Sequence, residues 1–231
     1  MINKLKKFAV LCILFLLSTL SFSEEILEDF DNLKMWESFT FKNINNKSKY
    51  TVDKGVLVTS SDNSASGIMY RKRFNPYETP IIKWKWKLEN VYKKGNSKIK
   101  SGDDFPLRIY ITFKYNAEVA TFNEKFKYLM IKKIYGEYPP HSALNYVWDS
   151  KNTRGEIVIN PYTSSSREIL IQVGSENLMK WIEEERNILE DYYQAFNEYP
   201  PKEASIAIMN DSDNTGESSK SYLDYLYILK K

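Results

Sequence analysis

The sequence is poor in the side chains on which many enzymes and metal centres depend. Its 231 residues include one cysteine, Cys12, and one histidine, His141. A single histidine excludes a metal site built on several imidazoles, and it leaves one loop residue for a histidine-dependent catalytic triad. The eight glycines form neither a phosphate-binding loop nor a dinucleotide fingerprint, and no G-x-S-x-G elbow occurs.

Cys12 lies in an N-terminal stretch with the composition of a secretory leader. Residues 1–7 are basic, residues 8–17 are apolar, and Ser21 and Ser23 are small residues at the two positions that a signal peptidase reads. We predict a signal peptide, residues 1–23, that is cleaved after Ser23, because the apolar run is short for a membrane span. The mature protein is then periplasmic or secreted. It has no cysteine, no disulfide and no transmembrane segment.

The mature chain also lacks an excess of charge. The leader holds three of the 33 Lys and Arg residues and none of the 30 Asp and Glu residues, so residues 24–231 carry 30 of each sign. This balance argues against nucleic-acid binding, which needs a basic excess to neutralise phosphates. With 42% hydrophobic residues, the chain can form a core. No linker or repeat divides it, which predicts a single domain over residues 24–231.

The spacing of hydrophobic residues predicts strands. Ile82, Trp84, Trp86 and Leu88 alternate with charged residues, and residues 105–113 alternate in the same way. Weaker strand patterns occur at 55–60, 67–74, 143–148, 156–160, 168–174, 205–210 and 221–230. About nine strands without regular helices between them predict a mainly all-β fold, in which two antiparallel sheets pack as a β-sandwich or jelly roll.

Residues 178–196 depart from the strand period. Leu178, Trp181, Ile182, Leu189, Tyr192, Tyr193 and Phe196 recur at helical spacing, and glutamates fill the opposite face. Pro200 and Pro201 prevent a longer helix. The pattern therefore predicts one amphipathic helix near 178–196, packed across an edge or end of the sandwich. A second, weaker helical pattern covers residues 122–132.

Two acidic loops are candidate sites. Asp103 and Asp104 precede the most apolar strand, and residues 211–216 alternate oxygen-bearing side chains before a glycine, as calcium loops do. The second loop is not an EF-hand, because Tyr222 stands where the bidentate acid belongs. Asp211 and Asp213 are the candidate metal ligands, and Asp103 or Asp104 could complete the site from the first loop. Asx turns joining two strands are the other interpretation.

Aromatic residues outside the core pattern indicate a sugar site. In residues 145–148 the strand alternation puts Tyr146 and Trp148 on one face, where they could form a platform with Arg108 and Tyr110. Aromatic rings stack on sugar rings, while Asp, Asn and Arg hydrogen-bond to hydroxyls. The alternative is that Trp148 closes the core. The candidate ligand-binding residues are Asp103, Asp104, Arg108, Tyr110, Asn145 and Trp148, and no residue is assigned as catalytic.

Five blocks in order resemble the bacterial family called domain of unknown function 3047 (DUF3047). The blocks are residues 80–86, 102–110, 143–148, 181–192 and 206–216. The resemblance spans residues 30–229. It implies a secreted single-domain protein with a sandwich similar to carbohydrate-binding jelly rolls or concanavalin-like sandwiches. It implies no reaction, since the family has none assigned.

Three functions are consistent with the sequence. The first is an extracytoplasmic, non-catalytic binding protein for a glycan or cell-envelope polymer, with calcium as the candidate cofactor. The second is a glycan-cleaving enzyme that pairs Asp103 or Asp104 with Asp211 or Asp213. The third is an envelope scaffold that binds another protein through a sheet edge or the glutamate-rich helix face. The balance is against an enzyme, because aspartates in turns are ordinarily solvated.

Overall fold

The computed structural model describes residues 24–115 and 140–231. The predicted leader, residues 1–23, and the predicted helix at 122–132 lie outside the described residues. Within the described part, no helix is long and apolar enough to cross a membrane.

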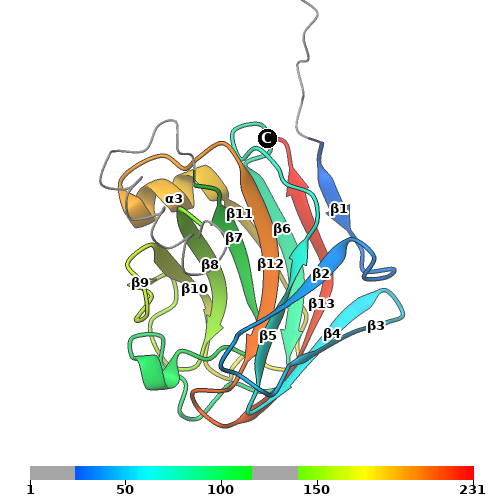
Figure 1. Ribbon diagram of the computed structural model, residues 1–231, viewed down its shortest axis with the longest axis vertical. Coiled ribbons are helices and arrows are strands. Elements are labelled where there is room, and N and C mark those ends of the chain that lie inside the picture. Colours follow the sequence, from blue (N-terminus) through cyan, green and yellow to red (C-terminus); the bar gives the residue numbers. More distant parts are fainter. Residues whose placement is uncertain (1–23, 116–139) are drawn as a thin grey trace, which may run out of the picture.

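The described strands form two sheets that stack face to face (Figure 1). The six-stranded sheet runs β11 (Ile182–Asn187), β6 (Ile81–Leu88), β13 (Ser218–Leu229), β4 (Val56–Asp62) and β3 (Lys49–Asp53), with β1 (Ile26–Glu28) also paired to β13. The seven-stranded sheet runs β2 (Trp36–Thr40), β5 (Ala65–Tyr70), β12 (Ala204–Asp211), β7 (Arg108–Phe113), β8 (Ser142–Asp149), β10 (Ser166–Val173) and β9 (Ile157–Ile159). The predicted β-sandwich is confirmed, and each of the nine predicted strand regions contains a strand.

One strand pair departs from the predicted antiparallel pattern. Strand β10 pairs with β8 in parallel, whereas it pairs with β9 antiparallel. Strand β9 lies on the far side of β10 from β8, so the chain reverses twice before β10 returns beside β8. The parallel register places Glu168 opposite Asn145.

The core lies between the inner faces of the two sheets and is rich in tryptophan. Trp84 and Trp86 on β6 are fully buried, and their ring centroids lie 5.4 Å apart in an edge-to-face arrangement. From the opposite sheet, Tyr146 packs on Trp84 with 5.2 Å between centroids, and Trp148 packs on Trp86 at 5.7 Å. These contacts confirm the inward face predicted by the alternation in β6, and each buried aromatic side chain contributes about 2 to 3 kcal/mol of apolar burial.

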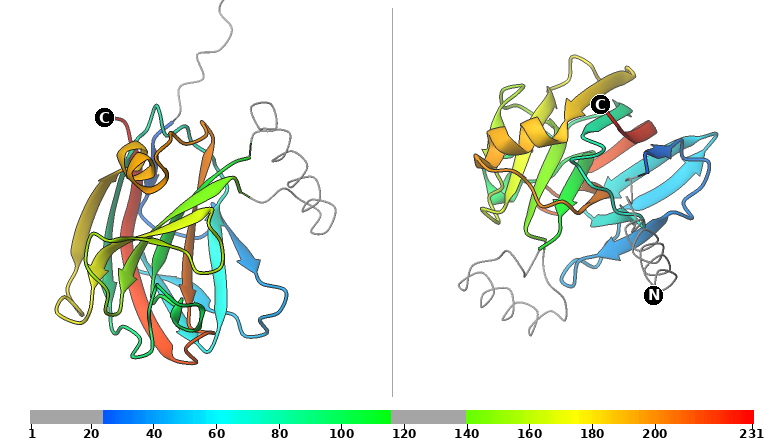
Figure 2. Two further views of the ribbon diagram at one scale, coloured as in Figure 1. Left: turned by 90° about the vertical axis from the view of Figure 1, so that its left-hand side faces the viewer. Right: turned by 90° about the horizontal axis from the view of Figure 1, so that it is seen from above.

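The helix predicted over 178–196 is present only in its second half. Helix α3 (Ile188–Phe196) begins after Asn187, whose side chain accepts hydrogen bonds from the backbone N–H groups of Leu189 and Glu190. The helix lies across the upper end of the sandwich (Figure 2). The segment before it is strand β11. There Lys83 on β6 pairs with Glu183, with 2.9 Å between Nζ and Oε1. The helix prediction was wrong for this segment because pairing with β6 overrides the local helical spacing.

Candidate functional site

Arg108 and Asp211 form a buried ion pair between neighbouring strands. Strands β7 and β12 are antiparallel, so the first residue of β7 lies near the last residue of β12. The Nε of Arg108 donates to Oδ1 of Asp211 at 3.0 Å, and Nη2 donates to Oδ2. Arg108 is 4% exposed and Asp211 is 1% exposed. This two-point geometry holds the guanidinium in a single orientation.

Two further carboxylates approach the same guanidinium. Nη1 of Arg108 lies 3.6 Å from Oδ1 of Asp103 and 4.0 Å from Oε1 of Glu168. Asn160, just after β9, bridges them, because its Nδ2 donates to Asp103 Oδ2 at 3.1 Å and to Glu168 Oε1 at 2.8 Å. We call Asp103, Arg108, Asn160, Glu168 and Asp211 the arginine cluster. It combines one fixed positive charge with three buried carboxyl groups.

This excess of carboxyl groups changes the protonation of Glu168. Burial and the nearby Asp103 carboxylate raise the pKa of Glu168 well above its ordinary value, and Arg108 offsets only part of this effect. Oδ1 of Asp103 and Oε2 of Glu168 are buried and have no hydrogen-bond donor among the described residues. The raised pKa of Glu168 favours its protonated form, and a protonated carboxyl group can donate a hydrogen bond to a neighbouring carboxylate such as Asp103.

The raised pKa of Glu168 makes stability depend on pH. The folded state binds this proton more tightly than the unfolded chain does. Protonation of Glu168 therefore makes its full contribution to the free energy of unfolding below the ordinary pKa of 4.5. It is lost as the pH rises through the folded-state pKa. We expect Glu168→Gln, which keeps the neutral shape, to gain stability relative to the wild type as the pH rises from acidic to neutral. Urea unfolding at a series of pH values measures this, with exposed Glu185→Gln as the control. Parallel pH profiles for wild type and Glu168→Gln would contradict the assignment.

The two acidic loops meet at the lower end of the sandwich in Figure 1. Asp104, Asp211 and Asp213 each offer an oxygen within 4.8 Å of the others. Asp104 already accepts hydrogen bonds from the backbone N–H groups of Asn214 and Thr215, at 3.3 and 2.6 Å. Both carboxyl oxygens of Asp211 accept hydrogen bonds from the Arg108 guanidinium. Calcium needs six to eight oxygen ligands. Two of the three carboxylates already accept hydrogen bonds from protein donors, so a cation would have to share these oxygens with them, and calcium binding here stays a prediction.

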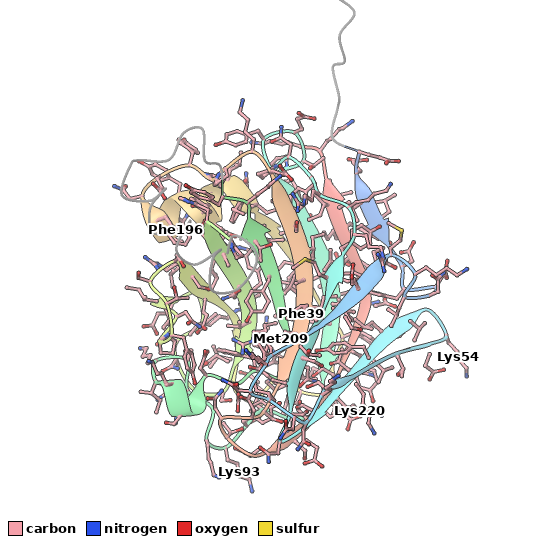
Figure 3. The ribbon with its side chains drawn as sticks, in the orientation of Figure 1. Phe39, Lys54, Lys93, Phe196, Met209 and Lys220 are labelled. Carbon is pink, nitrogen blue, oxygen red and sulfur yellow. The ribbon has the colours of Figure 1, made fainter. Side chains whose placement is uncertain are left out.

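Tyr110 and Asn145 extend the cluster along the outer face of the seven-stranded sheet. They are paired across β7 and β8. The Tyr110 hydroxyl donates to the sulfur of Met209, labelled in Figure 3, at 3.7 Å, and burial raises the pKa of Tyr110 to about 12. Asn145 is buried and donates to Ser166 Oγ at 2.8 Å. The structure thus brings five of the six candidate residues together, while their role in ligand binding stays a prediction.

Trp148, the sixth candidate, requires a correction. It is 0% exposed, packs on Trp86 between the sheets, and donates its indole N–H to the carbonyl of Gly174 at 3.0 Å. Side chains three apart in a strand point to opposite faces, so Asn145 on the outer face places Trp148 on the inner one. The predicted aromatic platform does not form, and Trp148 belongs to the core.

Tyr162 supplies the exposed aromatic ring that the sequence interpretation assigned to Trp148. It is 55% exposed, and its hydroxyl contacts the Lys100 carbonyl at 3.2 Å and Oδ1 of Asn214 at 2.6 Å. Burial and the Asp103 carboxylate raise the pKa of Tyr162. Its signal in the sequence is the turn formed with Asn160 and Pro161. Glu168, also missed, is a charge beside an apolar run, which is unusual in a buried strand.

Comparison with known proteins identifies related sequences and similar folds. The family model described as a protein of unknown function (DUF3047) matches residues 34–227, and no curated protein matches. The family 11 carbohydrate-binding module of the Clostridium thermocellum cellulase Lic26A-Cel5E is 12% identical, with 90% of this chain and 95% of that chain covered and a TM-score of 0.43. The carbohydrate recognition domain of Emp47p is 8% identical, with coverages of 92% and 99% and a TM-score of 0.47. Winged bean acidic lectin, complexed with methyl-alpha-D-galactose, is 8% identical, with coverages of 90% and 100% and a TM-score of 0.42.

Proposed function

We propose that this chain, which belongs to the DUF3047 family, is an extracytoplasmic, non-catalytic binding protein for a glycan or cell-envelope polymer. The ligand contacts Tyr162 and the polar side chains around it. The observation that carries the proposal is an exposed aromatic ring whose hydroxyl donates to Asn214, a side chain that the buried Asp104 holds in turn. The extracytoplasmic location follows from the leader composition of residues 1–23.

The residues around Tyr162 suit the recognition of sugar hydroxyls. Asp213 and Asn214 are half-buried and offer a carboxylate and an amide group, while Asn160 accepts a hydrogen bond from the backbone N–H of Tyr162 at 2.9 Å. The apolar face of a pyranose ring stacks on an aromatic ring, and such amides and carboxylates bind the hydroxyls at its edge. A half-buried surface position leaves these groups accessible while limiting their rotation.

The buried carboxylates position these contact residues. Asp103 holds the side-chain amide of Asn160 at 3.1 Å, and Asp104 holds that of Asn214 at 2.9 Å. Asn214 in turn accepts the Tyr162 hydroxyl. The contact residues are therefore ordered before the ligand arrives, which lowers the entropic cost of binding. Asp103, Asp104 and Arg108 act through them as positioning residues.

The same burial favours binding over glycan cleavage. A glycosidase needs two carboxyl groups that flank the scissile bond and reach the substrate. Asp103, Asp104 and Asp211 are at most 3% exposed, and each accepts hydrogen bonds from protein groups. Each of these carboxyl groups has at least one oxygen that accepts from a protein donor, which favours a structural support.

Replacement of Tyr162 tests the proposal. Purified protein is screened on an array of glycans and envelope polymers, and the affinity for the strongest ligand is measured by calorimetry. We expect Tyr162→Ala to weaken binding about tenfold, because ring stacking contributes about 1 to 1.5 kcal/mol. Tyr199→Ala, at a 66% exposed tyrosine beyond α3, is the matched control and retains full affinity. Equal losses in both variants, or no binding on any array, would reject the site.

A chelator arm in the same experiment tests the calcium hypothesis. We expect affinity to be equal in calcium and in chelator, because Asp104 and Asp211 are engaged by protein donors. Binding that disappears with chelator would mean that Arg108 releases Asp211 to a cation. Release of reducing sugar by the wild type, abolished in an Asp103→Asn variant, would instead favour the enzyme.

A further inference from the structure

The outer face of the six-stranded sheet carries a second set of partly exposed aromatic residues, whereas the arginine cluster lies on the seven-stranded sheet. A bulge in β13 between Leu223 and Tyr225 inserts one extra residue opposite β6. Leu223 and Leu226 therefore both remain in the core, while Tyr222 and Tyr225 both point outward. Trp181, just before β11, lies beside Tyr222, with 6.4 Å between the ring centroids and planes inclined at 67°.

Three lysines surround these two rings. Lys87 Nζ lies 4.8 Å from the Trp181 centroid and 4.4 Å from that of Tyr222. Lys85 Nζ lies 5.5 Å from Trp181, and Lys220 Nζ lies 5.3 Å from Tyr222. Lys220 is labelled in Figure 3. We call Lys85, Lys87, Trp181, Lys220 and Tyr222 the aromatic-lysine patch.

The lysines of the patch differ in their anionic partners. Lys85 pairs with Asp224 at 2.8 Å, and Lys220 lies 3.7 Å from Glu89. Lys87 has no carboxylate within ion-pair distance among the described residues. The two rings hold its ammonium group by cation–π attraction, which orients the charge without neutralising it. The patch therefore presents one oriented, uncompensated positive charge beside an exposed indole.

We propose that the aromatic-lysine patch binds an acidic polysaccharide through the carboxylates of its uronic acid residues. A uronate carboxylate pairs with Lys87, while the sugar ring packs on Trp181, which is 36% exposed. This surface lies on the opposite sheet from Tyr162, so it does not depend on the function proposed for that site. One unpaired lysine on a chain of zero mature net charge does not suit nucleic acid. An acidic peptide lacks the rigid ring face that matches the indole.

The structure offers matched variants for a test. Lys83 lies on the same strand and the same face as Lys87, but its ammonium is paired with Glu183 at 2.9 Å. The probe is polygalacturonate, and its fully methyl-esterified form is the uncharged ligand control. We expect Lys87→Gln to weaken polygalacturonate binding about threefold to fivefold, the upper range for an ion pair at the surface, and Trp181→Ala to weaken it about tenfold, the loss expected for a stacked ring. We expect Lys83→Gln and Tyr199→Ala, at residues outside both proposed sites, to stay within about twofold of the wild type.

Several results would overturn the proposal. Equal losses for Lys83→Gln and Lys87→Gln would show unspecific charge attraction, and equal binding of polyglutamate would show that the sugar ring is not recognised. Undiminished binding of the esterified polymer would remove the role of Lys87. Absence of polygalacturonate binding by the wild type would reject the ligand class. Circular dichroism and thermal unfolding of each variant establish that it is folded. If Trp181→Ala does not fold, Lys87→Gln still tests the proposal.

Discussion

Replacing Arg108 with methionine is expected to lower the free energy of unfolding by about 3 to 5 kcal/mol, the cost of breaking a buried ion pair by removing one partner. Methionine fills a similar volume but leaves Asp103, Glu168 and Asp211 buried without a cation. The buried carboxyl groups then lose the one positive charge that offsets their burial. Urea unfolding of the wild type and Arg108→Met at neutral pH measures the difference.

The same experiment includes a control substitution at an exposed arginine and a second substitution that is expected to restore stability. Arg154 lies 4.0 Å from Glu184, but its side chain is 63% exposed, so Arg154→Met is expected to cost about 1 kcal/mol or less. Adding Asp211→Asn to Arg108→Met removes one unpaired charge and is expected to restore part of the stability. If Arg108→Met unfolds at the same urea concentration as Arg154→Met, the carboxyl groups do not depend on the guanidinium for their burial.

Truncation of Trp148 is expected to cause the second large loss of stability. We expect Trp148→Ala to destabilise the protein by about 3 to 5 kcal/mol, because the cavity left in a tightly packed core is filled only in part by relaxation. The substitution removes the packing of the Trp148 indole on Trp86 and its hydrogen bond to the carbonyl of Gly174. Chemical unfolding gives the loss, and ligand binding measured at low temperature, where the variant is folded, gives the effect on the site.

The matched control for this prediction is Trp181→Ala, which removes a half-exposed indole and is expected to cost about 1 kcal/mol or less. Ligand affinity at the Tyr162 site is expected to survive in folded Trp148→Ala. A stable Trp148→Ala variant that no longer binds ligand would return this residue to the binding site and contradict its assignment to the core.

The strands were predictable because their signal is local. The alternation in residues 82–88 determines which side chains face the core wherever β6 is placed, and the structure has the same inward set. Strand β11 was not predictable in this way. Its residues have helical spacing, and they become extended because the edge of β6 offers backbone partners and lysines opposite Glu183.

The candidate site was predictable in part for the same reason. Asp103, Asp104 and Arg108 lie close together in the sequence, so a local motif indicated them. Glu168 and Tyr162 were missed, because no local pattern shows that β10 pairs in parallel with β8 or that its preceding turn approaches the loop of Asn214. Their proximity to Arg108 depends on the strand order of the seven-stranded sheet.

The sequence by itself determined the charge balance, the scarcity of cysteine and histidine, and the faces of most strands, because composition and period two belong to the chain before it folds. The tertiary structure alone decided that Trp148 lies in the core, that Arg108 pairs with Asp211, 103 residues away, and that the pKa of Glu168 is raised by burial. Burial and charge pairing are set by neighbours distant in the sequence, and only the packed sheets bring those neighbours together.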